Sequence, residues 1–477
     1  MNQNETPLAD ALFKQSRSSF IPFDVPGHKD NVMELSNFFG DQCISLDKNS
    51  RYSIDNLCQP TGVIREAETL AAQTFGAHYA FFMVGGTTSS VQSMIMSACT
   101  HGDKIILPRN VHASAINAII LSGAIPIYVN PGIHDTLGIS LGMPINEVKQ
   151  AIAYNTDAKA IFVNNPTYYG ICSNLVEIVK LAHKHNMLVL VDEAHGTHFH
   201  FHDQLPMSAM QCGADMSAVS MHKTGGSLTQ SSMLLINNEL DEEYIRSIIN
   251  LSRTTSASYL LLASLDIARK KIALEGSSLL CQLLESVNNC RAMINTIGDY
   301  YSFADEIIDN STIFDFDKTK LCINTSGLGL SGIETYTLLR DQYNIQLEFG
   351  DIKNVLAITS IGDKNENFEL LIKGLQDIRE KYKTDNAIPF NYEYITPIIK
   401  MSPAKAFYAM KKKTPVNKSK GHISGDYVMC YPPGIPLLAP GELITQDVID
   451  HILYSSEKGC TITGLGTTAP KEINVIL

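Results

Sequence analysis

The sequence predicts an α/β fold whose central sheet is mostly parallel and is covered by helices on both sides. Between about residues 60 and 240, short apolar runs alternate with amphipathic stretches, and apolar runs without polar alternation are typical of strands buried on both faces. One intervening stretch, SNLVEIVKLAHKHN, places four apolar side chains on one face at helical spacing. The predicted strands are YAFFMV (79–84), KIILP (104–108), IPIYV (125–129), AIFVN (160–164), MLVLVD (187–192), AVS (218–220) and SMLLIN (232–237).

The rest of the chain predicts further domains. Residues 258–298 contain few helix breakers and predict one long helix, and residues 320–382 read as strand, helix, strand, strand, helix, with IQLEF as one of the strands. The charged, proline-bearing stretch KYKTDNAIPFNYEY (381–394) is typical of a linker. We therefore expect an N-terminal segment (1–60), a large domain (61–257), a linking helix with a small α+β domain (258–383) and a C-terminal domain (384–477).

Composition narrows the class of protein. A net charge of −12 argues against nucleic acid as a partner and mildly favours cationic ligands. No apolar run reaches membrane-spanning length, because the longest, AINAIILSGAIPIYV, is interrupted by Asn117, Ser122, Gly123 and Pro126. The ten cysteines are scattered without a CxxC pair, and the chain begins with a polar stretch. These features predict a soluble cytoplasmic protein with free thiols and no membrane partner.

The stretch VGGTTSSVQSM (84–94) is a candidate anion site. A glycine pair follows a strand, and hydroxyl residues including Thr87 and Thr88 open a helix, where unpaired N–H groups favour a phosphate. The stretch lacks the lysine of a P-loop and the spacing GxGxxG. On this stretch alone, an ordinary helix cap is the favoured explanation, because serine and threonine are preferred at helix starts.

The stretch MLVLVDEAHGTHFHFH (187–202) places Asp192, Glu193 and His195 at the end of a strongly apolar strand. Open α/β sheets bind ligands at the carboxyl ends of their strands. His198, His200 and His202 alternate, and in an extended segment they would share one face that could bind zinc. No further ligand cluster lies near them in the sequence, so no metal is included in the predicted site.

Three other strand ends carry reactive residues. His112 lies between a strand and a helix in RNVHASAINA, NNPTYYG (164–170) carries Thr167 and Tyr168, and Lys223 follows the buried stretch GADMSAVS in SMHKTGGSLTQSS. Together with the phosphate candidate and Asp192, they form the set that pyridoxal 5'-phosphate (PLP) requires. A helix start would hold the phosphate, an aspartate would keep the ring nitrogen protonated, a flat residue would stack on the ring and the lysine would bind the cofactor covalently.

The sequence resembles the Orn/Lys/Arg decarboxylase family, which consists of fold-type I (aspartate aminotransferase-like) PLP enzymes. The resemblance covers nearly the whole chain and is strongest to the short bacterial arginine decarboxylases of the spermidine pathway. Its motifs are FDVPGHKD (23–30), FGAHYAFFMVGGTT (75–88), PRNVHAS (108–114), NNPTYYG, VDEAHGTH (191–198), SMHKTGGSLTQSS, TTSASYLLLASLD (254–266) and YPPGIPLLAPGE (431–442). The combination of SxHK, DEAHG and PGHK is highly specific.

The resemblance implies a role for individual residues. Lys223 matches the lysine that binds PLP, Asp192 the partner of the ring nitrogen, and His112 the histidine that stacks on the ring. The remaining implied cofactor contacts are Thr87, Thr88, His195, Ser220 and His222. Short members lack the N-terminal wing domain, as does this chain, which implies a homodimer or dimer-based homo-oligomer. Thr255 and Ser256 are then expected to reach the phosphate of the partner subunit.

Two departures from the family pattern concern the substrate. Ala113 stands where the family usually has lysine, and Asp426 stands where short members tend to have glutamate. Asp426 and Glu442 flank the rigid YPPGIP turn and are our candidates for binding the distal end of the substrate. We expect L-arginine as substrate, with agmatine and carbon dioxide as products, and His222 as a candidate for the acid that protonates the α-carbon.

Several alternatives stay open at the level of the sequence. Lysine or ornithine could replace arginine, and an aminotransferase or another lyase could use the same scaffold. A zinc-dependent hydrolase based on the HxHxH run, which metal analysis would reveal, belongs to a different class. A regulatory homologue without cofactor is disfavoured because the full constellation is present.

Overall fold

The structure is a computed structural model that describes residues 2–237, 240–386, 395–432, 434–466 and 471–477. The chain divides into two compact units, one formed by residues 1–97 and 193–280 and the other by residues 98–192 and 281–477. This division by contacts differs from the predicted domain boundaries, which stay predictions. Most of the predicted linker lies outside the described residues.

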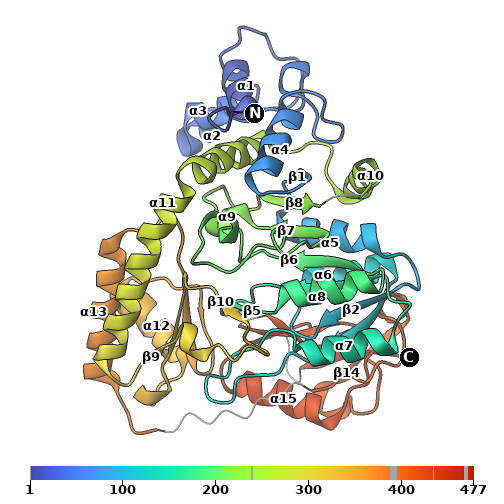
Figure 1. The fold of residues 1–477 in the computed structure, drawn as a ribbon, viewed down its shortest axis with the longest axis vertical. Coiled ribbons are helices and arrows are strands. Elements are labelled where there is room, and N and C mark those ends of the chain that lie inside the picture. The colour runs from blue at the N-terminus through green and yellow to red at the C-terminus, as the bar shows by residue number, and fades with distance from the viewer. Residues whose placement is uncertain (1, 238–239, 387–394, 433, 467–470) are drawn as a thin grey trace. The chain divides into compact units, whose positions relative to one another are not determined.

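The first unit contains three buried strands in the order β1-β8-β7, paired antiparallel (Figure 1). Every residue of these strands is buried, as the apolar runs predicted. The strands are β1 (Tyr79–Met83), β7 (Met216–Val219) and β8 (Ser232–Ile236). Their pairing brings the end of β1 next to the start of β8, since Met83 is opposite Ser232.

Helices complete the first unit, with α4 packed on β1 and α1 packed on α4. They are α1 (Pro7–Ser16), α2 (Met33–Phe39), α3 (Asp41–Leu46), α4 (Val63–Thr74), α5 (Gly86–Ala98), α9 (Met221–Thr224), α10 (Glu242–Ser252) and the first part of α11 (Tyr259–Ile297). Two 3-10 turns, η1 (Tyr52–Ile54) and η2 (Phe199–Phe201), lie in this unit. The 39 residues of α11 confirm the predicted long helix.

The second unit contains a parallel sheet in the order β6-β4-β2-β3. Its strands are β2 (Lys104–Pro108), β3 (Ile125–Val129), β4 (Ala160–Asn164) and β6 (Leu188–Asp192), which agree with the predicted runs to within one residue. Helix α7 (Ile145–Tyr154) packs on β3, and α8 (Leu175–Lys184) packs on β6 and on α7. In α8, Leu175, Ile178, Val179 and Ala182 are the buried residues, which confirms the predicted apolar face.

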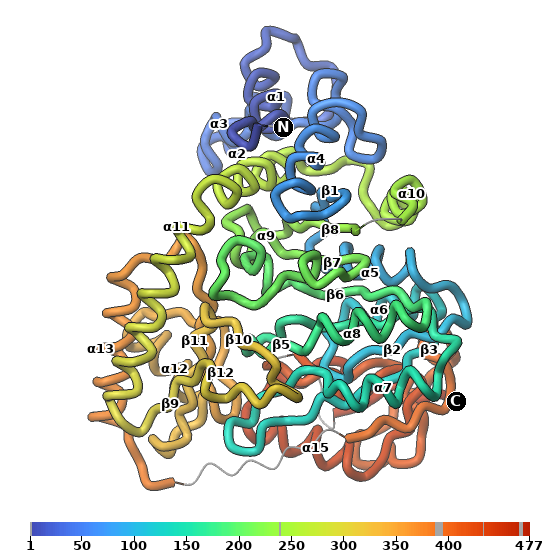
Figure 2. The backbone as a smooth tube through the Cα atoms, viewed as in Figure 1, coloured from blue at the N-terminus to red at the C-terminus, as the bar shows by residue number. Residues whose placement is uncertain are grey.

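A small antiparallel sheet, with strand order β12-β13-β11-β9, forms the predicted α+β part of the second unit (Figure 2). Helix α12 packs on β12, on β13 and on α13. The elements of this part are β9 (Tyr301–Ser302), β11 (Lys320–Asn324), α12 (Gly332–Tyr343), β12 (Phe349–Gly350), β13 (Asn354–Ile358) and α13 (Asn365–Tyr382). Strands β5 (Ile171–Cys172) and β10 (Asp315–Phe316) form a separate antiparallel pair. Two short 3-10 turns are η3 (Asp305–Ile307) and η4 (Ser326–Leu328).

The predicted strand IQLEF was wrong for most of its length. Asn344 ends α12 in a left-handed conformation, and the N–H of Ile345 still bonds to Leu339 at that helix end. Ladder pairing with β13 therefore begins only at Phe349.

The C-terminal part of the second unit combines two small antiparallel sheets with helix α15 (Gln446–Glu457). Helix α14 (Pro403–Tyr408) of this part packs on α6 (Ala113–Ser122), which lies between β2 and β3 in the chain. Strand β14 (Lys411–Pro415) pairs with β18 (Glu472–Ile476), and η5 (Val416–Lys418) follows β14. The other sheet has the order β16 (Ile435–Leu438), β15 (Val428–Tyr431) and β17 (Thr461–Thr463). Among the described residues, none of the helices combines the length and the apolar character that a membrane crossing requires.

Candidate functional site

Lys223 lies in the short helix α9, directly after the buried strand β7. Its backbone N–H bonds to the carbonyl of Ser220, which fixes the start of the helix. The Nζ atom of the half-buried Lys223 lies 2.8 Å from Nε2 of His195, a side chain only 5% exposed. The first unit therefore holds an amine beside an imidazole that can exchange a proton with it.

A cluster of hydroxyl groups lies at the start of α5. Thr87 hydrogen-bonds to the hydroxyl of Ser220 and donates to that of Ser232 at 3.1 Å. Ser90 bonds to Ser232 at 2.8 Å, and Ser232 donates to the carbonyl of Val219 at 2.8 Å. The cluster connects the start of α5, which follows the predicted phosphate loop, to the end of β7 and the start of β8.

Two glycines, Gly85 and Gly86, lie where β1 leads into α5. A Cβ atom on Gly85 would lie 2.3 Å from the hydroxyl of Ser89, so a side chain at this position would require a shift. Gly86 has φ +69°, which favours glycine. Thr88 is exposed at the helix start, whereas Thr87 is buried. These features suit an anion held by Thr88 and the first N–H groups of the helix. Thr87 would hold the helix start in place through its hydrogen bonds to Ser220 and Ser232.

Sequence reasoning missed Ser90 and Ser232. The available signal was the pair of serines in TQSSMLLIN, where an otherwise apolar buried strand begins with hydroxyl groups. Their contact with Thr87 depends on the antiparallel pairing of β1 with β8, which the sequence did not predict.

The histidines after Asp192 serve separate structural contacts. His198 Nδ1 lies 3.1 Å from the hydroxyl of Thr224, and His200 Nδ1 lies 3.4 Å from that of Ser208. The predicted extended segment with His198, His200 and His202 on one face was wrong, because residues 199–201 form the 3-10 turn η2. Burial lowers the pKa of His200. Within the described part of the chain, no three His, Cys, Asp or Glu side chains are grouped to hold a metal ion.

Glu193 and His222 are tied to the backbone around them. The buried carboxylate of Glu193 accepts hydrogen bonds from the N–H of Ala209 at 2.7 Å and from the hydroxyl of Ser217 at 2.8 Å. Glu193 therefore stabilises the turn after β6 through these two hydrogen bonds. His222 Nδ1 lies 2.9 Å from the carbonyl oxygen of Ser231, and its ring is half-buried.

In the second unit, Asp192 ends β6 and is 6% exposed. The N–H of Asn165 donates to its carbonyl at 3.0 Å, so the turn after β4 starts beside it. His112 is the N-cap of α6, where its Nδ1 accepts the N–H of Ser114 at 3.2 Å. Its imidazole is half-buried, and Ala113 begins the helix.

The acids predicted to bind substrate have partners within the chain. Asp426 accepts hydrogen bonds from Lys411 and from Asn474, both at 2.6 Å. Glu442 is 2% exposed and forms a bidentate ion pair with Arg109, with N–O distances of 2.6 and 2.8 Å. Its carboxylate also accepts a hydrogen bond from the N–H of Ala439. Both carboxylates are therefore neutralised by neighbouring side chains.

The residues predicted to reach a partner subunit, Thr255 and Ser256, are exposed. Their loop is braced locally, since the N–H of Ser256 donates to the hydroxyl of Thr254 at 3.1 Å.

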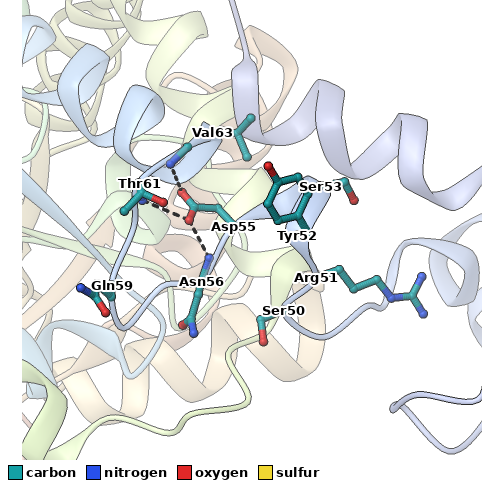
Figure 3. A pocket seen from close by; sticks show the side chains of 10 residues that line it. Ser50, Arg51, Tyr52, Ser53, Asp55, Asn56, Gln59, Thr61 and Val63 are labelled. Carbon is teal, nitrogen blue, oxygen red and sulfur yellow. Dashed lines mark hydrogen bonds between the residues drawn. The ribbon is translucent and has the colours of Figure 1, made fainter.

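A polar pocket in the first unit contains none of the predicted site residues (Figure 3). Its acidic residue, Asp55, accepts the backbone N–H groups of Thr61 at 3.1 Å and Gly62 at 2.7 Å. Asp55 therefore closes the turn before α4. The pocket is lined by Ser50, Arg51, Tyr52, Ser53, Asp55, Asn56, Gln59, Thr61, Gly62 and Val63.

Comparison with solved structures shows the fold. A lysine decarboxylase from Francisella novicida matches with a TM-score of 0.88 over 99% of this chain and 82% of its own, at 21% identity. An alanine–glyoxylate aminotransferase from Nostoc matches with a TM-score of 0.55 over 76% of this chain and 98% of its own, at 14% identity. The chain has the α/β fold of amino acid decarboxylases and aminotransferases, as predicted.

The chain belongs to the Orn/Lys/Arg decarboxylase family. It matches the major domain of that family over residues 6–367 and the C-terminal domain over residues 389–468. An arginine decarboxylase from Bacillus anthracis is 44% identical over 100% of this chain and 98% of its own length. Another from Bacillus subtilis is 41% identical over 100% of this chain and 99% of its own. The resemblance drawn from the motifs is thus confirmed.

Proposed function

We propose that the chain is a PLP-dependent decarboxylase that converts L-arginine to agmatine and carbon dioxide. The observation that carries the proposal is the amine of Lys223 held 2.8 Å from His195 at the end of a buried strand, in a chain of this family. The arginine decarboxylases at 41–44% identity support arginine over lysine and ornithine. Agmatine formation would place the enzyme in polyamine biosynthesis.

Bound PLP would supply an electron-accepting ring that makes the bond to the leaving carboxylate breakable. Lys223 would hold the cofactor covalently, and His195 would accept or donate the proton at Nζ as that link exchanges with the substrate amine. Asp192 would hold a proton on the ring nitrogen, and His112 would stack on the ring. These roles of Asp192 and His112 rest on the family motifs that they match.

The remaining predicted residues would complete the site. Thr88 and the start of α5 would hold the phosphate, supported by Thr87 and Ser220, and His222 would donate the proton to the α-carbon. Thr255 and Ser256 are exposed, as a contact with the phosphate of a partner subunit would require. We therefore include a homodimer, or a larger assembly of dimers, in the proposal.

The direct test incubates the purified protein and PLP with arginine, lysine and ornithine separately, and identifies the amine product together with released carbon dioxide. We expect agmatine to form fastest. Faster formation of cadaverine or putrescine would overturn the substrate assignment, and an amine-transfer product without carbon dioxide would overturn the reaction.

A further inference from the structure

Ser232 carries a fully buried hydroxyl that the proposed chemistry does not use. It begins β8, and its hydroxyl donates a hydrogen bond to the carbonyl of Val219 at 2.8 Å. The same oxygen lies 3.1 Å from the hydroxyl of Thr87 and 2.8 Å from that of Ser90, and both residues are on α5. Ser232 therefore joins the end of β7 and the start of β8 to the first turns of α5.

The number of protons in this cluster fixes the direction of each hydrogen bond. The carbonyl of Val219 can only accept, so the one proton of Ser232 is used there. Ser232 must then accept from both Thr87 and Ser90, which fills its two acceptor positions. Thr87 has no second proton, so in its hydrogen bond with Ser220 the donor is Ser220. The protons of the cluster are therefore all directed inward, towards the carbonyl of Val219.

This direction decides which groups could hold an anion at the start of α5. The hydroxyls of Thr87 and Ser220 have their protons in use within the cluster. The N–H of Gly86 is also in use, because it donates to the carbonyl of Gln230 at 2.8 Å. The donors that an anion could use are the exposed hydroxyl of Thr88 and the next N–H groups of the helix.

These donors can bind an anion only if the start of α5 is held in place. Two glycines precede Thr87, and glycine restricts the backbone less than any other residue. Thr87 and Ser90 lie about one turn apart on α5 and both donate to Ser232, so these bonds fix the helix to the buried strands. The carbonyl of the preceding residue, Ser231, lies 2.9 Å from Nδ1 of His222, so the start of β8 also contacts α9.

We propose that Ser232 is a positioning residue of the phosphate site, which holds the start of α5 in place through Thr87 and Ser90. The inference rests on the proposed function, because the phosphate is that of PLP. Ser232 would not touch the phosphate. Its loss would leave two buried hydroxyl groups without their acceptor, which is costly, so both would turn to other partners. The helix start would then lose the fixed geometry in which its N–H groups meet the phosphate.

The test measures cofactor affinity rather than turnover. Apoenzyme is titrated with PLP and, separately, with pyridoxal, which carries the same aldehyde but no phosphate. The absorbance of the lysine-bound ligand follows both titrations. Ser232→Ala should raise the Kd for PLP by roughly five- to thirtyfold, as expected for the loss of two hydrogen bonds. The Kd for pyridoxal should stay close to that of wild type, because pyridoxal has no phosphate to position.

Ser93→Ala is the matched control. Ser93 is on the same helix and is 1% exposed, but its hydroxyl makes no hydrogen bond within the part of the chain that the structure describes. This variant should bind both ligands as wild type does. Ser232→Cys fills the space of the serine with a sulfur that accepts hydrogen bonds weakly, so it should behave as Ser232→Ala does. Ser90→Ala removes one of the two bonds and should cause a smaller loss, which decides the question if Ser232→Ala does not fold.

Two results with Ser232→Ala would overturn the inference. One is a Kd for PLP equal to that of wild type, and the other is an equal loss of affinity for PLP and pyridoxal, which a general loosening of the fold would cause. Wild-type affinity in Ser232→Cys would also overturn it, because the role would then belong to packing volume. A wild type that forms no lysine-bound adduct with PLP would instead overturn the proposed function.

Discussion

At the residue scale, the central feature is an amine placed where a buried strand ends. Lys223 is half-buried, and its Nζ lies 2.8 Å from Nε2 of His195. The sequence predicted Lys223 as the cofactor lysine from the set of strand-end residues that accompany it. It did not predict the contact with His195, because 28 residues separate the two and the turn after β6 sets their approach.

Replacing Lys223 gives the most direct prediction at this scale. Lys223→Ala should abolish the visible absorbance of lysine-bound cofactor and reduce turnover to background, since no other amine would hold the cofactor there. Borohydride reduction of the wild type, followed by peptide mapping, should locate the modification on Lys223. Lys271→Ala, which changes an exposed lysine of α11, is the control and should keep both signals. Modification of Lys29 in wild type would contradict the assignment.

Asp192→Asn tests the proposed partner of the ring nitrogen. A carboxylate favours the protonated nitrogen through charge pairing, and an amide does not. We expect the fold to persist, cofactor affinity to fall and kcat to fall by about a hundredfold or more, because each lost 1.4 kcal/mol of transition-state stabilisation costs a factor of ten. Circular dichroism, cofactor titration and steady-state assays would check these outcomes. Turnover within a few-fold of wild type would assign the role elsewhere.

At the element scale, the sequence predicted best those parts that depend on local pattern. β2, β3 and β4 begin and end where the predicted strands do. In β2 and β4, four of the five residues are buried, as expected for a strand covered on both faces, whereas three of the five residues of β3 are only partly buried. The prediction for segment 198–202 was wrong because its alternating histidines follow the period of a strand. In the structure, the N–H of Phe201 bonds to the carbonyl of His198 and closes a tight turn. Periodicity alone does not distinguish these two conformations over five residues.

Contacts between residues that are far apart in the chain could not be predicted from the sequence pattern. Arg109 and Glu442 are 333 residues apart, and nothing in PRNVHAS or LLAPGE indicates that they pair. In the structure, their ion pair joins the segment after β2, three residues before His112, to the loop after β16. The Arg109 guanidinium also lies 4.9 Å from the ring centre of Tyr128.

Removing one partner of this pair should be costly. Glu442→Gln removes the negative charge that pairs with the buried Arg109 guanidinium, so we expect a loss of about 3–5 kcal/mol of stability. A lowered thermal midpoint, measured by calorimetry, would check this. Asp426→Asn should cost less, because the Lys411–Asp426 pair is 20% and 26% exposed, whereas the Arg109–Glu442 pair is 3% exposed on both sides. Equal losses in the two variants would show that burial of the pair is unimportant.

At the scale of the whole molecule, the N-terminal segment exposes many large apolar side chains. Phe20, Ile21, Phe23 and Phe38 are 76–94% exposed. Ion pairs hold this segment in place, including Arg51 with Asp24 at 2.6 Å and Lys48 with Asp30. A fixed apolar surface of this kind is typical of a protein interface, and a second copy of this chain is the partner that the proposed assembly requires.

The last prediction therefore concerns assembly. Size-exclusion chromatography with light scattering should give wild type a mass of twice the 52.4 kDa chain mass, or a higher even multiple of it. The double change Phe23→Glu and Phe38→Glu places charges on the exposed apolar segment, so it should shift the population towards monomer. Activity should fall with the dimer fraction, because Thr255 and Ser256 are proposed to serve the partner's phosphate. Tyr154→Glu, which changes an 84% exposed side chain on α7, is the control and should leave the mass unchanged. A monomeric wild type with full activity would refute the interface, and so would a charged variant that keeps the mass of wild type.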